Sequence, residues 1–237
     1  MNNPATGEPK ERYRVREKIA EAPAVFTLKL SREDGTTPSY LPGQFITIYF
    51  PELGTPEGKA YSISSAPFEP TLAITVKKMG EFSNRLCALQ TGDALVASRP
   101  CGYFFSESRE SSLVLIAAGI GIAPFRGIIL DALQHNPKRE IFLFYSNRTV
   151  SDIIFANLLT SLPAVTVIHF ITREMSVPQE MRCGRMSAAS LLETIGEAPN
   201  PEFLICGSIS FVRDLWRELQ KAGVAEECIY TEAFFSH

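Results

Sequence analysis

Residues 113–124, LVLIAAGIGIAP, give the clearest indication of how the second half of the chain folds. This stretch joins a continuous apolar run, 113–117, to a turn with two glycines and then to Pro124. Such a short apolar run is typical of a strand buried on both faces, and proline suits the first turn of a helix because no partner for its N–H is needed there. The stretch therefore predicts a buried strand, a tight turn and a helix, the unit from which parallel sheets are built.

The same alternation of apolar runs and helical segments continues toward the carboxyl terminus. Strands are expected at 113–117, 141–145, 165–170, 203–206 and 229–230, and helices at 124–134, 152–161, 187–195 and 209–222. Strands that alternate with helices in this way form a parallel sheet with helices on both faces. We therefore predict an α/β nucleotide-binding domain over residues 110–237.

Before residue 110 the rhythm is different. Apolar and polar residues alternate at 24–30, 45–50 and 72–76, which is the periodicity of half-buried strands. Turn signals at 33–35, 41–43 and 91–93 separate the runs, and one helix is expected near 83–89. This pattern predicts a meandering antiparallel β-barrel or sandwich over residues 1–109.

Composition narrows the possible partners. The 237 residues carry a net charge of −3, which provides no general attraction to nucleic acid or to an anionic membrane. With 45% hydrophobic residues, a chain of this length can bury the cores of two domains. No apolar run is long enough for a transmembrane segment, and residues 1–18 lack the apolar centre of a secretory signal, so a cytoplasmic location is expected.

The cysteines do not form a recognisable metal or disulfide pattern. Five of them stand at positions 87, 101, 183, 206 and 228, at irregular spacing. This spacing contains no metal-binding pair and no C-x4-C-x2-C run of the plant-type ferredoxin kind, so no metal site is expected. Any iron-sulfur partner is expected to be a separate chain.

The glycine turn that opens the α/β half offers a place for a phosphate group. Gly119 and Gly121 let the backbone approach an anion closely. Ile122 and Ala123 lead into Pro124 and a helix whose amino terminus carries free N–H groups and partial positive charge. The third glycine of the usual dinucleotide fingerprint is missing, so a plain strand-to-helix turn is the competing interpretation.

Three arginines are expected at one rim of the sheet: two of them follow predicted strands, and the third lies just before the helix expected at 187–195. Ligands of open parallel sheets bind beyond the carboxyl ends of the strands, where Arg148, Arg173 and Arg185 could gather around the 2′-phosphate of NADP(H). Solvated surface charge is the alternative for each of them. NAD(H) is possible as well, because Asp152 and Glu174 lie close in the sequence, and an acidic residue commonly binds the free ribose 2′-hydroxyl.

Read together, the motifs of the chain resemble those of the ferredoxin-NADP reductase family, whose members join an FAD-binding β-barrel to an NAD(P)-binding α/β domain in this order. The resemblance covers nearly the whole chain, and the order and spacing of the motifs carry it. The motifs are Pro42-Gly43-Gln44-Phe45, residues 59–65, Gly80-Glu81-Phe82-Ser83, Gly92-Asp93, residues 100–104, the turn at Gly119, and Cys206-Gly207-Ser208.

The resemblance implies a flavin site around Tyr61 and Ser62. Tyr61 would pack on the isoalloxazine ring and the ribityl chain, and the hydroxyl of Ser62 would approach flavin N5 as hydride arrives or leaves. Taken alone, the two residues are a half-buried strand aromatic and a strand-end hydroxyl. Lys59 stands where the family usually has an arginine at the flavin phosphates, so the charge is kept and the bidentate fork is lost.

A second phosphate anchor is implied at Gly80 and Ser83, where a glycine turn opens a helix. A plain helix cap is the competing interpretation of Ser83. Two phosphate anchors suit the pyrophosphate of FAD better than the single phosphate of FMN. The further residues that the resemblance assigns to the cofactor sites are Ile63, Ser64, Val76, Lys78 and Phe82.

Two segments near the carboxyl terminus complete the implied site. Cys206, followed by Gly207, would pack beside the reactive carbon of the nicotinamide, with a buried structural thiol as the alternative. The last residues resemble a terminal segment that carries an acid and an aromatic near the flavin, which nominates Glu232 and either Phe234 or Phe235. Ordinary packing of the last strand is the alternative there. The candidate catalytic residues are Ser62, Cys206 and Glu232.

The function that the resemblance implies is hydride transfer between NADPH and FAD, with electrons passed to a separate one-electron acceptor such as ferredoxin or flavodoxin. A flavin is needed because nicotinamides exchange two electrons as hydride, whereas iron-sulfur and haem carriers take one. The alternative is a non-catalytic flavin-binding electron-transfer or regulatory subunit of a larger complex.

Overall fold

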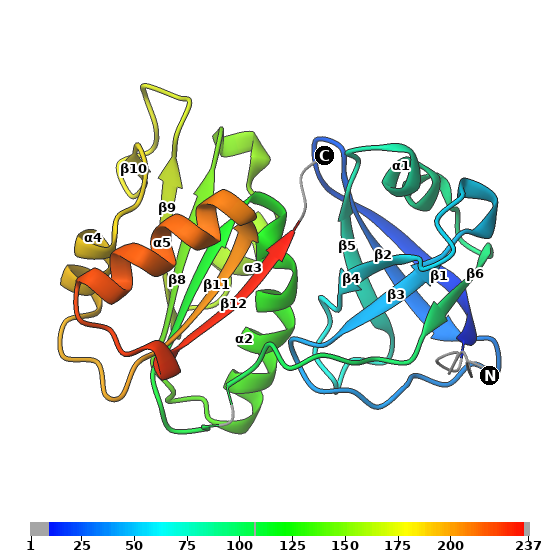
Figure 1. Cartoon of the computed structure of the whole chain (residues 1–237), viewed down its shortest axis with the longest axis horizontal. Helices are drawn as coiled ribbons and strands as arrows, with labels where there is room; N and C mark the ends of the chain where they lie inside the picture. The colour runs from blue at the N-terminus through cyan, green and yellow to red at the C-terminus, as the bar shows by residue number, and fades with distance from the viewer. Residues whose placement is uncertain (1–9, 107, 235–237) are drawn as a thin grey trace, which may run out of the picture.

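The computed structural model describes residues 10–106 and 108–234, which form two domains that lie side by side (Figure 1). The first is an antiparallel sheet in the order β4-β3-β6-β1-β2-β5. An antiparallel bridge between Ile63 and Ile74 joins its two ends, so the sheet closes into the expected barrel. Its strands are β1 (Lys10–Ala22), β2 (Val25–Arg32), β3 (Phe45–Tyr49), β4 (Lys59–Ser62), β5 (Leu72–Lys77) and β6 (Ala94–Ser98), with helix α1 at Glu81–Ala88 and a 3-10 turn at Pro51–Leu53.

The longest strand of the barrel, β1, was not among the strands expected from the sequence. Its charged residues hide the alternation, although Tyr13 and Val15 are fully buried on one face. Two register shifts against β2 mark bulges, which increase the local twist and let a strand bend around a barrel. The apolar side chains that point inward from all six strands form the core of this domain.

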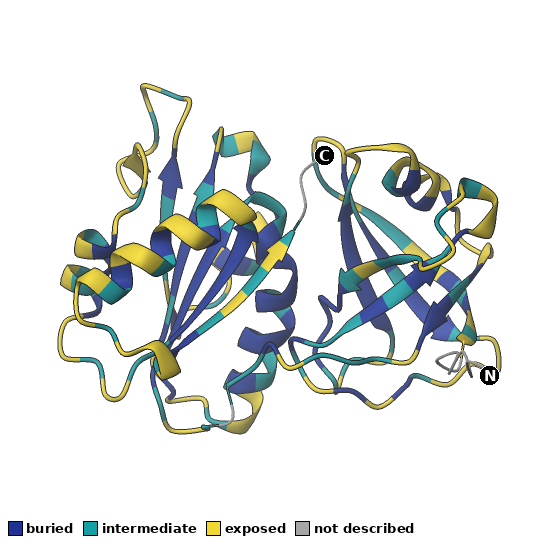
Figure 2. Ribbon diagram, viewed as in Figure 1, coloured by how far each residue is buried: buried dark blue, intermediate teal, exposed yellow. Residues whose placement is uncertain are grey.

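The second domain is a parallel sheet in the order β10-β9-β8-β7-β11-β12, as expected. Its strands are β7 (Leu113–Ala118), β8 (Ile141–Asn147), β9 (Val165–Ile171), β10 (Arg182–Cys183), β11 (Glu202–Ser208) and β12 (Ile229–Phe234). Its helices are α2 (Ala123–His135), α3 (Ala156–Thr160), α4 (Ala188–Ile195) and α5 (Ile209–Lys221), with 3-10 turns at Gly119–Ile122, Val150–Asp152 and Glu226–Cys228. The helices α2 and α3 pack on one face of the sheet, and α4 and α5 on the other. Figure 2 shows the sheet buried between helices whose outer faces are exposed.

Two elements of this domain differ from expectation. The helix expected at 152–161 is replaced by a 3-10 turn and the short helix α3, because Phe155 adopts a left-handed conformation with φ of 60°. Strand β12 continues to Phe234, well beyond the expected 229–230. Thr231 and Ala233 are exposed on this edge strand, so residues 231–234 lack the continuous apolar run of an inner strand.

The two domains meet along α2 of the second domain. Gly127 lies against the turn that follows β4, and a Cβ atom at this position would stand 2.5 Å from the carbonyl oxygen of Ser65. Val25 of the barrel and Phe104 of the segment between β6 and β7 are buried in the same apolar cluster as α2. Among the described residues, no helix is long and apolar enough to cross a membrane.

Candidate active site

A cavity of about 580 Å³ opens where the barrel meets the α/β domain. The barrel supplies most of its wall, from β3, β4, β5 and the start of α1. The second domain supplies Ile120 and Ala123 from the glycine turn and the end of β12, with Glu232 and Phe234. The volume lies within the range of small-molecule and cofactor sites.

Ser62 and Glu232 both line this cavity and form a hydrogen bond between the two domains. The Ser62 hydroxyl donates to Glu232 Oε2 at 2.9 Å, and the Cys206 thiol lies 3.9 Å from the same oxygen. Cys206 and Glu232 are register partners on the neighbouring parallel strands β11 and β12. The topology therefore brings the three candidate catalytic residues together from distant parts of the sequence.

Burial determines the protonation state of Glu232 and Cys206. It raises the pKa of Glu232 to about 7, and the hydrogen bonds from Ser62 and Cys206 offset only part of that rise. Burial, together with the Glu232 carboxylate, raises the pKa of the Cys206 thiol well above its usual value. Cys206 is fully buried and does not line the cavity. Glu232 can therefore gain or lose a proton near neutral pH, while Cys206 stays a neutral thiol.

Aromatic rings form the barrel side of the cavity. The rings of Tyr61 and Phe82 stack with centroids 6.3 Å apart and an angle of 22° between their planes. Burial raises the pKa of the Tyr61 phenol, so the ring stays neutral. The ammonium of Lys59 lies 5.6 Å from the centroid of Phe82, and Lys59 also lines the cavity. A flat apolar surface beside a cation suits a planar ring system that carries phosphate groups.

The glycine turn before α1 has the geometry of a helix cap. The Ser83 hydroxyl accepts the N–H groups of Met79 and Gly80 and donates to the Gly80 carbonyl at 3.0 Å. Because the Ser83 hydroxyl is hydrogen-bonded within the turn, it is not the group that would bind an anion. The backbone N–H groups of the first helical turn, which have no partner within a helix, are available for that role. Gly80 and Ser83 line the cavity at this point.

The remaining flavin-site predictions divide into two sets. Val76 lines the cavity, whereas Ile63 and Ser64 do not and are fully buried in the barrel. The Lys78 ammonium lies 5.1 Å from the centroid of Phe26, outside the cavity wall. The cavity residues that the sequence analysis missed include Glu57, Gly58, Thr75, Lys77 and Met79. Lys77 is the last residue of β5, whereas Lys78 lies beyond the end of the strand.

The glycine turn of the α/β domain is held from two sides. The Tyr145 hydroxyl donates to the carbonyl of Gly119 at 3.0 Å. A Cβ at Gly121 would lie 2.2 Å from the Cys206 carbonyl oxygen, so this glycine lets the turn pack on β11. Ile122 is buried, and Pro124 occupies the first turn of α2, as expected. Gly207 is buried between Ala118 and Phe211 in the same layer.

Arg148, Arg173 and Arg185 follow three adjacent strands, β8, β9 and β10, and all three are exposed. The backbone N–H of Arg173 donates to the carbonyl of Arg148 at 2.8 Å, so these two segments touch. The two acidic residues of this region already accept hydrogen bonds from the nearby turn at residues 149–150. Asp152 accepts the N–H and hydroxyl of Thr149, and Glu174 accepts the N–H of Val150.

At the carboxyl end, Phe234 is half-buried and lines the cavity. The second aromatic candidate, Phe235, lies outside the described residues. The cavity as a whole fits an isoalloxazine ring, because its lining combines stacked aromatic rings, lysines and a helix amino terminus with the hydrogen-bonded pair of Ser62 and Glu232.

Comparison with known proteins agrees with this arrangement. Residues 115–216 match the family model described as an oxidoreductase NAD-binding domain. The FAD/NAD-binding domain of nitric oxide dioxygenase from Vibrio cholerae superposes with a TM-score of 0.83 at 30% identity, covering 94% of this chain and 98% of that domain. A ferredoxin-NADP+ reductase from Neisseria gonorrhoeae, solved with FAD and NADP, has the same fold, with a TM-score of 0.78 at 22% identity over 95% of this chain and 99% of that one.

Two curated relatives are similar in sequence. The ferredoxin reductase component of 3-ketosteroid-9-alpha-monooxygenase from Mycolicibacterium smegmatis is 31% identical over 83% of this chain and 56% of its own length. The flavohemoprotein of Chromobacterium violaceum is 28% identical over 95% of this chain and 60% of its own. The chain thus spans less than two thirds of the length of either relative.

The fold and the site together define a flavin- and nicotinamide-nucleotide-binding oxidoreductase module. More specifically, the chain belongs to the ferredoxin-NADP reductase family.

Proposed function

We propose that the chain is an enzyme that binds FAD in the interdomain cavity, accepts hydride from NADPH, and passes electrons to a separate one-electron acceptor such as ferredoxin or flavodoxin. The observation that carries this proposal is the hydrogen bond between Ser62 and Glu232, which links the two domains at the wall of the cavity. It brings a hydroxyl from the barrel and a titratable acid from the nucleotide domain to one point. FAD, when bound, would supply the chemistry that takes two electrons as hydride and releases them one at a time.

The chain's own residues bind the cofactor and manage its protons. Tyr61 and Phe82 provide a surface for the ring, while Lys59 and the first turn of α1 bind phosphate. Glu232, with its pKa near neutrality, accepts or releases a proton through the Ser62 hydroxyl. Cys206 lies behind Glu232 and keeps the nicotinamide end of the site packed.

The proposal includes a preference for NADPH over NADH. Arg148, Arg173 and Arg185 bring positive charge to the rim formed by β8, β9 and β10. An acid that binds the ribose 2′-hydroxyl would favour NADH. Asp152 and Glu174 are instead hydrogen-bonded to the turn at residues 149–150. Their engagement supports recognition of a 2′-phosphate by arginine.

The test of this function is spectroscopic. We expect purified protein to carry FAD, identified by chromatography after denaturation, and to show rapid bleaching of the flavin with NADPH under anaerobic conditions. Addition of ferricyanide, an artificial one-electron acceptor, should restore the oxidised spectrum. Colourless protein that does not take up FAD would overturn the proposal. Yellow protein that NADPH does not bleach would favour the non-catalytic flavin-binding subunit.

A further inference from the structure

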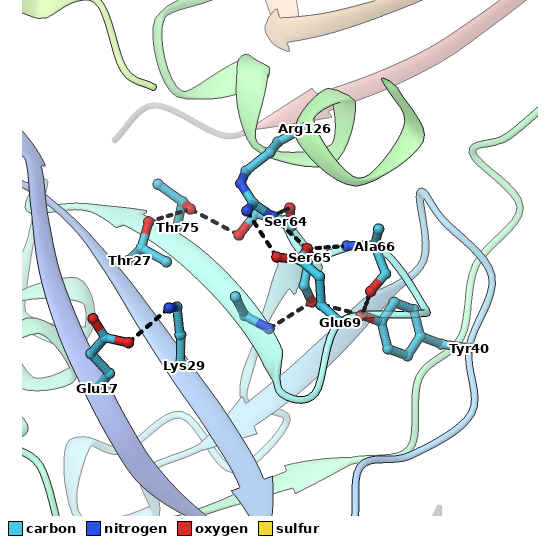
Figure 3. Close-up of polar contacts among 11 residues, drawn as sticks. Glu17, Thr27, Lys29, Tyr40, Ser64, Ser65, Ala66, Glu69, Thr75 and Arg126 are labelled. Carbon is cyan, nitrogen blue, oxygen red and sulfur yellow. Dashed lines mark hydrogen bonds and ion pairs between the residues drawn. The ribbon is translucent and has the colours of Figure 1, made fainter. Parts of the chain in front are cut away.

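Arg126, on the first turns of α2, crosses from the nucleotide domain to the barrel. Its Nη1 donates to Glu69 Oε2 at 2.7 Å and to the carbonyl of Ser64 at 3.0 Å, and its Nη2 donates to Glu69 Oε1 at 2.9 Å (Figure 3). This is a bidentate pair with an added backbone contact. The two side chains are only 20% and 22% exposed, so water and salt screen the pair less than they screen an exposed one.

The barrel side of this contact is rigidly built. Glu69 Oε2 also accepts the N–H of Ala66 at 2.6 Å, which holds the carboxylate in the turn that follows β4. The Tyr40 hydroxyl binds Ser65 Oγ at 2.7 Å and the Ala66 carbonyl at 2.9 Å from the other side (Figure 3). Arg126 therefore binds a turn whose position is already determined by the barrel.

The same turn is connected to the proposed flavin site. Thr75 is one of the residues that line the cavity, and its hydroxyl donates to Ser64 Oγ at 2.9 Å. Ser64 stands two residues after Ser62, the donor to Glu232. On the other side of the contact, α2 begins at Ala123, which lines the cavity from the nucleotide domain. Arg126 thus joins the segment that carries Ser62 to the helix that follows the glycine turn.

We propose that Arg126 is a positioning residue that sets the spacing between the flavin and the nicotinamide by holding the two domains together through Glu69 and Ser64. This inference rests on the proposed function. Hydride transfer requires the reacting atoms near contact distance, and a misplacement of about 1 Å can cost about 100-fold in rate. Neither Arg126 nor Glu69 lines the cavity, so loss of the pair should change the rate of hydride transfer and leave cofactor binding intact.

The experiment compares Arg126→Ala, Arg126→Lys and a matched control, Arg32→Ala. Arg32 and Glu11 form a similarly bidentate and half-buried pair inside the barrel, at 2.8 and 3.1 Å. Stopped-flow reduction of the FAD-loaded protein gives the limiting rate and the half-saturating NADPH concentration. Amide hydrogen exchange of residues 64–66 and 123–127 reports the domain contact without turnover.

We expect Arg126→Ala to keep its FAD, to lower the limiting rate roughly 10- to 100-fold, to change half-saturation less than about threefold, and to speed amide exchange in both segments. Arg126→Lys, which keeps the charge and loses the fork, should fall between Arg126→Ala and the parent and serves if Arg126→Ala does not fold. Arg32→Ala should retain the parent's limiting rate.

The outcomes separate the two proposals. An Arg126→Ala variant with the parent's limiting rate, or an Arg32→Ala variant slowed as much as Arg126→Ala, would overturn the positioning role alone. A parent protein that binds FAD but is not reduced by NADPH would overturn the proposed function and this inference with it.

Discussion

The hydroxyl of Ser62 donates to the carboxylate of Glu232 across the domain boundary at 2.9 Å, although the two residues are 170 positions apart in the chain. One comes from β4 of the barrel and the other from the edge strand β12 of the parallel sheet. The bond exists only when both domains are folded and docked. The protonation of the Glu232 carboxyl therefore depends on whether the two domains are docked.

The first prediction concerns the effect of Glu232 on stability. Its pKa is about 7 in the folded protein against 4.5 in the unfolded chain. Below pH 4.5 Glu232 is protonated in both the folded and the unfolded state, so it has no effect on the pH dependence of stability there. Between pH 4.5 and 7 it ionises only in the unfolded state, and the free energy of unfolding falls by up to about 3 kcal/mol. Glu232→Gln cannot ionise. Its stability relative to the parent should rise as the pH increases from 5 to 8, measured by urea unfolding with excess FAD; a difference independent of pH would contradict this.

Lys59→Ala is predicted to weaken FAD retention more than it slows hydride transfer, because we propose that the ammonium binds phosphate and does not contact the ring. A charge-assisted hydrogen bond contributes about 1.5–3 kcal/mol, so the dissociation constant of FAD should rise roughly 10- to 100-fold. Lys78→Ala is the matched control, since Lys78 faces Phe26 outside the cavity wall. Equilibrium titration of flavin-free protein gives both constants. Equal retention by Lys59→Ala and the parent would remove Lys59 from the site.

Cys206→Ser is predicted to leave FAD bound and to slow flavin reduction. Cys206 is fully buried, and its side chain is directed at the oxygen of Glu232 that Ser62 also binds. A serine hydroxyl is smaller and a stronger donor, so it changes the packing at the nicotinamide end and favours the ionised form of Glu232. The pH at which the reduction rate is half-maximal should move downward. Unchanged stopped-flow rates at every pH would mean that Cys206 has only a structural role.

Arg173→Ala is predicted to reduce the preference for NADPH. A charge-assisted hydrogen bond to the 2′-phosphate is worth about 1.5–3 kcal/mol, so kcat/KM for NADPH should fall about tenfold or more, while the value for NADH stays nearly constant. Arg185→Ala tests the neighbouring strand in the same way, and Arg217→Ala, on the exposed side of α5, is the control. A parent enzyme that prefers NADH would defeat the assignment.

Periodicity predicted the fold class correctly, because the strands of an antiparallel barrel alternate apolar and polar residues, whereas those of a covered parallel sheet are continuously apolar. The motifs also nominated Ser62, Cys206 and Glu232, which the structure brings together. Features that depend on three-dimensional contact were missed. Lys77 lines the cavity and was not nominated, whereas Lys78 was nominated and lies outside the cavity wall.

Arg126 gave no signal in the sequence, since an arginine on an amphipathic helix usually faces solvent. Its partners Ser64 and Glu69 lie in another domain, more than 50 positions away. No local pattern records such a pairing. The left-handed Phe155 was equally hidden, because its conformation depends on the packing around it.

Gly127 leaves no room for a side chain between α2 and the carbonyl of Ser65. The size of the side chain that fits at position 127 therefore depends on the distance between the two domains. A relative with a larger residue at this position must move either the helix or the turn, and its two domains must then meet at another angle. The identity of this one residue thus allows related sequences to be sorted by how closely their domains approach, before any of their structures is known.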